Sequence, residues 1–292
     1  MLGLRQSRFD VDDVLVIHMG GLGDVCLSES LFFSLREHFG NRLIALGNRK
    51  FLDLFGEYFK RTEGIESRHW LYLFSERLIG PVWKRIVFIG KDREGSIRRR
   101  WYSYSEEGLI FIDMYPDEAF ERKVSVSFLE GVPSEGMHIE DYQLSKLSQQ
   151  GIQPVKKKIA PRGGKRIIFY PEESLSKGKW PIDNFIAIFR LLQEQGADAV
   201  VLKPAGLSLP VERGLFIEDL ADVKVFFRQG GIFLSNDSGM AHLAGTCGLT
   251  TVTVFSDFSP VFWRPRGQNI SLSLGADEVD IRSLSLQITQ LL

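Results

Sequence analysis

Two loops of the chain combine glycine, a carboxylate and a helix-like stretch, residue types that suit phosphate binding and proton transfer. The first loop lies in VLVIHMGGLGDVCLSES, Val14 to Ser30, where Asp24 directly follows three glycines. Glycines this dense cost chain entropy unless another group approaches the backbone closely. A carboxylate at the start of a helix stays ionised at neutral pH because the helix dipole favours negative charge there. Such a group can accept a proton from an attacking hydroxyl, so Asp24 is the candidate general base.

Two other interpretations of this first loop are open. Asp24 can cap the following helix and satisfy its free N–H groups. Alternatively, Gly21 to Cys26 has the pattern G-x-G-x-x-C, one residue away from the dinucleotide-binding fingerprint. That second interpretation is disfavoured because Asp24 would face the pyrophosphate. In addition, the next expected strand ends in Gly47-Asn48-Arg49, without an acid to hold a ribose. A Rossmann dehydrogenase is therefore the weaker rival class.

The second loop lies in GIFLSNDSGMAHLAGTCG and follows an expected strand, Ile232–Ser235. A serine hydroxyl, a glycine and the free N–H groups of a helix start together make an anion site. We expect a diphosphate here, with Asp237 as the helix cap. We expect His242, one turn into a helix over Met240–Cys247, to donate to a phosphate oxygen. The predicted donor residues in this loop are Asp237, Ser238, Gly239, Met240 and His242.

A third loop, within FYPEESLSKGKWPIDNF, is rich in hydroxyl and ammonium groups, which suit a diphosphate. It follows a strand that ends at Tyr170 and precedes a helix that Trp180-Pro181 opens, because proline is favoured in the first turn of a helix. A plain solvated loop is the alternative. The interpretation as a donor site adds three residues, Ser174, Lys177 and Lys179.

Three consecutive arginines follow the expected strand Ile86–Ile89 and precede Trp101, Tyr102 and Tyr104. A solvated surface loop is one interpretation. In the other, the guanidinium groups pair with carboxylates or phosphates of an anionic acceptor, and the aromatic rings stack on sugars. The predicted acceptor side contains these arginines and the first loop: His18, Gly20, Gly21, Gly23, Arg98, Arg99 and Arg100.

Short apolar runs alternate with helix-type periods along the whole chain, which predicts parallel α/β sheets. The segment Gly151 to Arg166 contains two prolines and three glycines and is typical of an interdomain linker. We therefore expect two Rossmann-like, doubly wound domains that face a central cleft, residues 1–155 for the acceptor and 156–292 for the donor. The expected strands are Val14–Ile17, Leu43–Leu46, Ile86–Ile89, Leu109–Ile112, Ile167–Tyr170, Ala199–Leu202, Ile232–Ser235 and Thr251–Phe255.

The composition and charge of the chain disfavour several classes of protein, among them nucleic-acid-binding, zinc-binding and membrane-spanning proteins. The chain has 292 residues, 44% of them hydrophobic, which is enough for two cores. A net charge of -1 gives no indication of nucleic-acid binding. The two cysteines are far apart and have no His or Cys neighbour, which favours a reducing cytoplasmic setting over a zinc site. Neither a signal peptide nor a membrane span is expected. The carboxylates of a D-x-D sequence can bind a metal ion, but the one at Asp10 to Asp12 precedes the first strand and does not follow a strand. We therefore expect no bound metal. We also expect no cofactor.

Four segments occur in the order found in the ADP-heptose:lipopolysaccharide heptosyltransferases of glycosyltransferase family 9, which the chain resembles. They are VLVIHMGGLGDV, KWPIDNF, SNDSGMAHLAG and FWRPRG, and HIEDYQLSKLSQQGI also resembles the family's helix before the interdomain linker. The resemblance implies a GT-B fold, metal independence and inversion by direct displacement. It also implies that Asp24 is the base, and that Asp237, Ser238, Gly239 and His242 hold the donor diphosphate.

The function that this resemblance implies is transfer of a heptose-like sugar from a nucleotide-diphosphate sugar, with ADP-heptose as a candidate donor. The expected acceptor is lipopolysaccharide or another anionic glycan or glycolipid, in the cytoplasm or at the inner face of a membrane. Family members usually carry Lys or Arg at His18, and a lysine at Gly178. These differences favour an alternative, a catalytically inactive nucleotide-binding homologue of the same fold.

Overall fold

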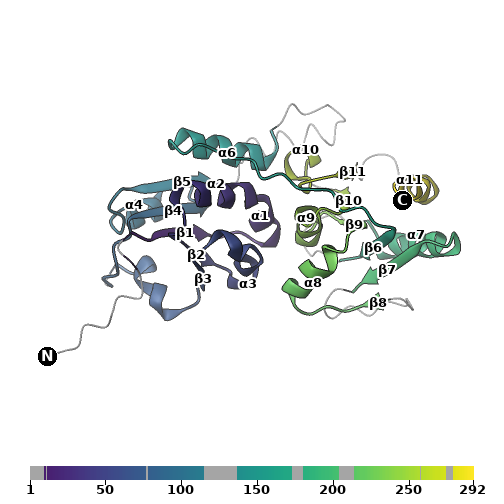
Figure 1. Ribbon diagram of the computed structural model, residues 1–292, viewed down its shortest axis with the longest axis horizontal. Coiled ribbons are helices and arrows are strands. Elements are labelled where there is room, and N and C mark those ends of the chain that lie inside the picture. Colours follow the sequence, from purple (N-terminus) through teal and green to yellow (C-terminus); the bar gives the residue numbers. More distant parts are fainter. Residues whose placement is uncertain are drawn as a thin grey trace. The chain divides into compact units, whose positions relative to one another are not determined.

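A computed structural model describes residues 10, 12–76, 78–114, 137–172, 180–203, 214–256, 258–273 and 279–292. The chain divides by its contacts into two compact units, and each unit contains one parallel sheet (Figure 1). The first unit comprises Met1–Gly21, Ser28–Tyr115 and Tyr142–Lys156, and the second comprises Leu22–Leu27, Pro116–Asp141 and Lys157–Leu292.

The sheet of the first unit has five strands in the order β3-β2-β1-β4-β5, and every neighbouring pair is parallel. The four strands expected in this half of the sequence are confirmed, and β3 is an addition. Strands β1 and β2 are buried along their whole length because helices cover both faces, as in other parallel sheets. The strands are β1 (Val14–His18), β2 (Leu43–Gly47), β3 (Arg61–Gly64), β4 (Arg85–Gly90) and β5 (Leu109–Asp113).

Different helices cover the two faces of this sheet. On one face, Leu15 of β1 belongs to a core with Trp70 of η2 (Arg68–Phe74) and Trp101 of α4 (Ser96–Tyr102). Side chains alternate along a strand, so His18 lies on the other face, where its ring meets Phe32 of α2 (Glu29–Phe39) edge-on at 5.6 Å between centroids. The remaining elements of this region are α3 (Arg49–Leu52), η1 (Asp53–Tyr58) and α6 (Ile139–Gln149).

The sheet of the second unit has six parallel strands in the order β11-β10-β9-β6-β7-β8. Numbered within the unit, this is the 3-2-1-4-5-6 order of a doubly wound domain. The four strands expected in this half are also confirmed. The strands are β6 (Arg166–Tyr170), β7 (Asp198–Leu202), β8 (Gly214–Leu215), β9 (Ile232–Asn236), β10 (Thr250–Phe255) and β11 (Asn269–Ser273).

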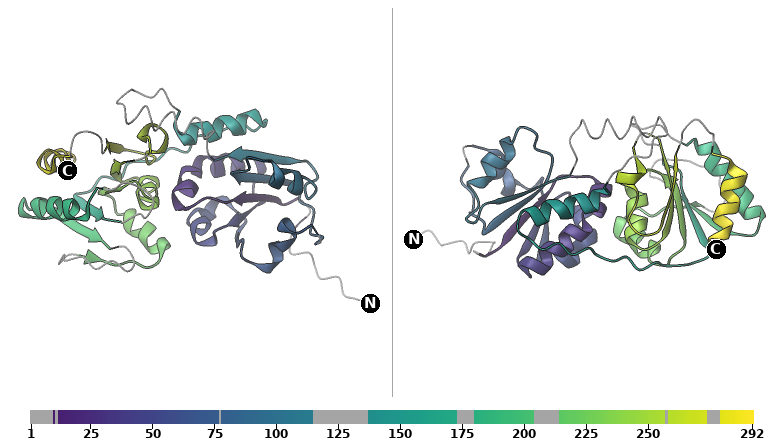
Figure 2. Two further views of the ribbon diagram at one scale, coloured as in Figure 1. Left: turned by 180° about the vertical axis from the view of Figure 1, so that it is seen from behind. Right: turned by 90° about the horizontal axis from the view of Figure 1, so that it is seen from above.

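Helices α7 (Ile182–Glu194) and α11 (Ile281–Gln290) pack together on one face of this second sheet (Figure 2). Phe233 of β9 lies on the opposite face and packs on Phe227 of α8 (Leu220–Phe227), with 5.1 Å between ring centroids. The helix predicted over Asp183–Gln195 is confirmed as α7. The short helix α10 (Pro260–Trp263) follows β10.

In each sheet, the strand order reverses beside a strand that carries a predicted loop. In the first unit, β1 lies between β2 and β4, and the glycine loop follows β1. In the second unit, β9 lies beside β6 at the reversal, and Asp237 follows β9. Doubly wound sheets bind ligands at the carboxyl ends of their strands at such a reversal. The prediction of two doubly wound parallel-sheet domains is therefore confirmed. No helix in the described ranges is long and apolar enough to cross a membrane.

Candidate active site

The loop after β9 leads directly into helix α9 (Gly239–Thr246), as the sequence predicted. Asp237 continues the hydrogen bonding between β9 and β10, because its N–H donates to the Val254 carbonyl of β10 at 2.8 Å. Ser238 is the helix cap, with extended backbone angles and a side-chain oxygen that accepts from the Ala241 N–H at 3.3 Å. The expectation that Asp237 caps α9 is therefore wrong. The Asp237 backbone is still bonded to β10, so the cap position falls on the next residue, Ser238.

The start of α9 offers hydrogen-bond donors to an anion. Gly239 and Met240 are the first two residues of the helix, so their N–H groups have no carbonyl four residues earlier within it. The Ser238 hydroxyl accepts from Ala241 and keeps its own hydrogen for a ligand. These three donors lie at the positive end of the helix dipole, which favours negative charge. The local chemistry is that of a phosphate site.

His242 is buried beside this helix start, with only 6% of its surface exposed. Its Nε2 atom lies 3.6 Å from Oδ1 of Asp237. Its Nδ1 atom has no hydrogen-bond partner among the described residues. A buried ring nitrogen without a partner is costly, and a ligand oxygen would remove that cost. His242 therefore has one nitrogen toward the loop carboxylate and one that is available for a ligand.

Helix α1 (Leu22–Leu27) carries Asp24 and groups with the second unit because it contacts α9. A Cβ atom on Gly23 would lie 2.8 Å from Cδ2 of His242, and one on Gly239 would lie 3.0 Å from Cβ of Leu22. A real Cβ atom essentially never lies closer than 3.0 Å to another atom, and at 3.0 Å the neighbouring group would have to shift. Glycine at both positions thus allows α1 and α9 to touch. The groups that approach these two glycines closely therefore come from the other helix of the pair, α9 for Gly23 and α1 for Gly239. The sequence alone did not reveal this reason for the glycines.

Asp24 is the third residue of α1 and lies within its first turn, so it is not at the capping position. The carboxylate is half-buried, and the next three residues of α1 are fully buried. The residue before it, Gly23, meets the His242 ring. The candidate base and the candidate phosphate site are therefore neighbours in one unit.

His18 is buried at the end of β1 and has a structural role in the glycine loop. Its Nδ1 atom accepts from the Gly20 N–H at 3.2 Å, so the ring proton lies on Nε2. That Nε2 atom lies 3.2 Å from the Ser28 hydroxyl. His18 thus holds the turn between β1 and α2 from inside. Gly20 is half-buried and Gly21 is exposed.

Asn236 connects the end of β9 to the start of α7, a role that the sequence reasoning missed. Its Oδ1 accepts from the Trp180 N–H at 3.1 Å, and its Nδ2 donates to the Trp180 carbonyl at 3.3 Å. This reciprocal pair places Trp180, two residues before the start of α7, beside the Asp237 loop. The three predicted donor residues Ser174, Lys177 and Lys179, like Gly178, lie outside the described residues.

The segment after α10 is held by a buried ion pair. Nε of Arg266 lies 2.6 Å from Oε1 of Glu140, and both side chains are at least 95% buried. Arg266 also donates to the Lys157 carbonyl at 2.9 Å. Its own carbonyl lies 2.5 Å from where a Cβ of Gly245 would be, so α9 packs directly on this backbone. The ion pair thus secures α9, the helix whose start is the candidate phosphate site.

His138 makes a second connection to the same segment. Nε2 lies 2.9 Å from the Arg264 carbonyl, and Nδ1 accepts from the Glu140 N–H at 3.3 Å. Burial lowers the pKa of the His138 imidazole below its ordinary value, which keeps the ring neutral. Both nitrogens are used, one as donor and one as acceptor. The motif segments that include His138 and Arg264 were noted in the sequence only as points of resemblance.

The three arginines lie on helix α4 and not on a loop. Arg98 pairs with the buried Asp92 at 3.2 Å and lies over the Phe111 ring. Arg100 donates to the Phe74 carbonyl at 3.0 Å and pairs with Glu76 at 3.2 Å. Arg99 is exposed and donates to the Glu94 carbonyl. Consecutive helix residues point about 100° apart, so the three guanidinium groups do not form one row.

The aromatic residues after these arginines differ in exposure. Trp101 is buried and donates to the Leu73 carbonyl at 2.8 Å, so it cannot stack on a sugar in this conformation. Tyr104 is partly buried and bonds to the Tyr72 and Leu78 carbonyls. Tyr102 is 64% exposed and remains open to a ligand.

Comparison with known proteins gives one family match and several structural matches. The sequence model of glycosyltransferase family 9 (heptosyltransferase) matches residues 219–283, which include the Asp237 loop and α9. No curated protein sequence matches the chain.

Among solved structures, the E. coli heptosyltransferase WaaC with ADP is 12% identical to this chain, with a TM-score of 0.68. The match covers 96% of this chain and 100% of the WaaC chain. E. coli ADP-heptose LPS heptosyltransferase II is 14% identical, with a TM-score of 0.64 and coverages of 96% and 98%. A family 9 glycosyltransferase from Veillonella parvula is 13% identical, with a TM-score of 0.63 and coverages of 97% and 90%. These matches confirm the resemblance to family 9 and the GT-B type of fold.

Proposed function

We propose that this protein is a glycosyltransferase that moves a heptose-like sugar from a nucleotide-diphosphate sugar to an anionic glycan or glycolipid acceptor, with inversion. The observation that carries the proposal is the contact between α1 and α9. It puts a half-buried carboxylate beside a helix start with free N–H groups, a hydroxyl and a buried histidine. The carboxylate can then act on the attacking hydroxyl, while the groups at the helix start bind the departing diphosphate.

The proposed reaction is a single displacement. Asp24 accepts the proton of the acceptor hydroxyl as its oxygen forms a bond to the anomeric carbon. The bond from that carbon to the diphosphate oxygen breaks, and the diphosphate leaves with the electron pair. Its growing charge is stabilised by the Ser238 hydroxyl, the Gly239 and Met240 N–H groups and Nδ1 of His242. The acceptor is an alcohol and the product a glycoside of inverted configuration.

Thermal unfolding with added nucleotides tests the donor side. We expect ADP or another nucleoside diphosphate to raise the melting temperature, because a ligand that binds only the folded state stabilises it. Ser238→Ala should remove most of this rise. Its matched control is Asp219→Ala, which deletes the cap of α8 and leaves the donor loop unchanged. A rise with NAD and none with any nucleoside diphosphate would favour the dehydrogenase rival.

The alternative is an inactive homologue that binds the donor without transfer. His18, where family members usually carry a cation, is used to hold the turn. An assay with ADP-heptose and a lipopolysaccharide acceptor separates the two functions, since only the enzyme releases ADP on addition of the acceptor. We place the protein in the cytoplasm, where its two buried cysteines, which form no disulfide with each other, stay reduced.

Metal independence is part of this proposal, and we expect EDTA to leave the transfer rate unchanged. In the described part of the chain, no three His, Cys, Asp or Glu side chains come together as a metal site. Asp10, the first carboxylate of the D-x-D, pairs with Lys60. The initial rate would be measured with EDTA alone and with EDTA plus magnesium. Loss of activity that magnesium restores would contradict the mechanism.

The acceptor side can be tested at α4. We expect replacement of Arg98, Arg99 and Arg100 by alanine to raise the acceptor KM and to leave donor binding unchanged, and the effect to weaken at high salt because exposed charges are screened. Arg98→Ala alone is the control, because Arg98 is paired with Asp92. This variant shows how much of the change comes from losing that internal ion pair and not from losing contacts with the acceptor. Wild-type acceptor kinetics in the triple variant at low salt would show that these arginines bind no acceptor.

A further inference from the structure

Three of the five histidines of the chain are buried, and His242 differs from the other two in its hydrogen bonding. His18 and His138 each use both ring nitrogens. His242 has no hydrogen-bond partner at Nδ1 among the residues that the structure describes. The remaining two histidines, His38 and His69, are exposed. His242 is therefore the buried ring whose protonation a ligand can still change.

The edge of the His242 ring that carries Nε2 is enclosed by the protein. Oδ1 of Asp237 lies 3.6 Å from Nε2, and the His242 and Asp237 side chains are 7% and 9% exposed. A Cβ atom on Gly23 would lie 2.8 Å from Cδ2 and 3.5 Å from Nε2, so the Gly23 backbone covers the same edge. An ionised carboxylate only accepts hydrogen bonds, so it favours a proton on Nε2. Nδ1 is therefore the nitrogen that is left for a ligand.

The same ring lies close to the candidate phosphate site at the start of α9. His242 is the fourth residue of this helix, one turn after Gly239. Side chains on a helix lean toward its N-terminus. The short distance to Asp237, which precedes the helix, shows that the His242 ring does so. We therefore expect a diphosphate bound at the start of α9 to approach Nδ1.

We propose that this site binds a nucleoside diphosphate together with one proton, which His242 holds on Nδ1. Ionised phosphate oxygens, like an ionised carboxylate, accept hydrogen bonds and cannot donate them. A neutral imidazole has a single N–H, which Asp237 keeps on Nε2. A second acceptor at Nδ1 therefore requires a second proton, because only the imidazolium donates from both nitrogens. The inference rests on the proposed function and extends it, because it makes binding at the donor site depend on pH.

The charged groups around α9 agree with a ring that gains a proton when the ligand binds. Strands β9 and β10, which pack on α9, have no titratable side chain. The other packed elements contribute Asp24 and Cys26 on α1, Asp222 and Lys224 on α8, and Arg264 and Arg266 on the segment after α10. Arg266 is paired with Glu140, and the Lys224 carbonyl lies by Cys247, beyond the far end of α9. Asp237 is thus the charged group in ion-pair contact with the ring, and it and the diphosphate both attract positive charge there.

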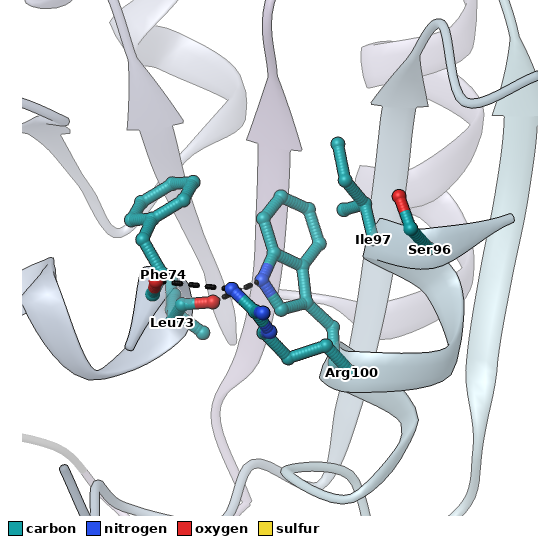
Figure 3. Close-up of a pocket in the computed structure, with 6 residues that line it drawn as sticks. Leu73, Phe74, Ser96, Ile97 and Arg100 are labelled. Carbon is teal, nitrogen blue, oxygen red and sulfur yellow. Dashed lines mark hydrogen bonds between the residues drawn. The ribbon is translucent and has the colours of Figure 1, made fainter. Parts of the chain in front are cut away.

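A small cavity of the first unit also has a cation in its lining, but it does not suit a nucleotide. Its volume is about 90 Å³, well below the roughly 300–1,000 Å³ of small-molecule pockets. Figure 3 shows the Arg100 guanidinium group at the backbone of Phe74, where Nη1 donates to the Phe74 carbonyl at 3.0 Å. Arg100 also pairs with Glu76. We therefore assign proton uptake with a nucleotide to the site at α9.

Isothermal titration calorimetry of the full chain with ADP measures this proton. At pH 7.5 the terminal phosphate of ADP is almost fully ionised, so a proton taken up on binding goes to the protein. Titrations in HEPES and in Tris, whose ionisation enthalpies differ, give the number of protons. We expect about half a proton to one proton per ADP bound. The dissociation constant should then rise roughly three- to tenfold per pH unit above pH 7.5, because the complex holds more protons than the free protein.

Two variants locate the proton on the ring. His242→Gln keeps a hydrogen-bond donor but cannot titrate, so it should bind ADP more weakly at pH 7.5 and without proton uptake. Asp237→Asn should also bind ADP without uptake, because its amide can donate to Nε2 and a neutral ring can then carry its single proton on Nδ1. The matched control is His69→Gln, the same change at an exposed histidine of the first unit, and it should take up as many protons as the wild type.

Binding of ADP to the wild type without proton uptake overturns the inference and leaves the proposed function standing, because the donor site still binds its ligand. Uptake in His242→Gln or Asp237→Asn that equals the wild-type value overturns it as well. Asp237→Asn decides the question even if His242→Gln does not fold, since this change removes a charge and keeps the shape of the side chain. If no nucleoside diphosphate binds to the wild type, the proposed function fails and the inference fails with it.

Discussion

Asp24→Asn is expected to lower the rate of sugar transfer by about 10²–10⁴-fold, the usual contribution of a general base. The amide has nearly the same shape but cannot accept the hydroxyl proton. Donor affinity should stay within a few-fold of the wild type, because removing a carboxylate beside an anion site does not weaken anion binding. The measurement is the transfer rate with saturating donor, together with a donor titration.

The control for this variant is Asp222→Asn, since Asp222 is the third residue of α8, as Asp24 is of α1. Both changes remove a carboxylate from the positive end of a helix, which costs roughly 0.3–1 kcal/mol of stability. Only Asp24→Asn should lose activity. Retention of more than about a tenth of the rate would mean that Asp24 is not the base.

Arg266→Met is expected to destabilise the second unit by about 3–5 kcal/mol, because it removes the buried guanidinium group that pairs with the Glu140 carboxylate. For a unit of this size, that change corresponds to a fall of about 10 °C in the melting temperature. The measurement is differential scanning calorimetry. Because the chain has two compact units, their transitions should be fitted separately.

Arg264→Met is the control for this second prediction. Arg264 is exposed and lies two residues away from Arg266. Among the residues that the structure describes, its side chain donates only to the Pro260 and Val261 carbonyls of its own short helix. It should leave the melting temperature nearly unchanged. The double variant Arg266→Met/Glu140→Leu should recover much of the loss, since two apolar side chains can replace a buried ion pair. A double variant as unstable as Arg266→Met would show that another Arg266 contact matters more.

The local patterns of the sequence determined which segments are strands and helices, and therefore where the loops lie. Runs such as Val14–Ile17 and Ile232–Ser235 are apolar throughout because both faces of a parallel sheet are covered. The placement of Asp24 and Ser238 at helix starts followed from the same patterns. Each of these properties depends on neighbours within a few residues, so one sequence is enough to predict them.

Contacts between residues far apart in the sequence were decided only by the tertiary structure. Glycine at Gly23 and Gly239 is explained by the His242 ring and Leu22, which packing brings together. Ser238 caps α9 in place of Asp237 because pairing with β10 holds the aspartate backbone. No pattern predicts such contacts, because they depend on how helices fill the space beside a sheet.

The same division applies to the residues that position the site. The sequence contains an acid at Glu140 and a base at Arg266, and resemblance drew attention to both segments, but nothing local pairs residues that are more than a hundred positions apart. The structure pairs them because both are buried around α9, where a single charge would be unstable. The chemistry of the site is thus determined by residue type and spacing, and its geometry by burial, which only the folded chain creates.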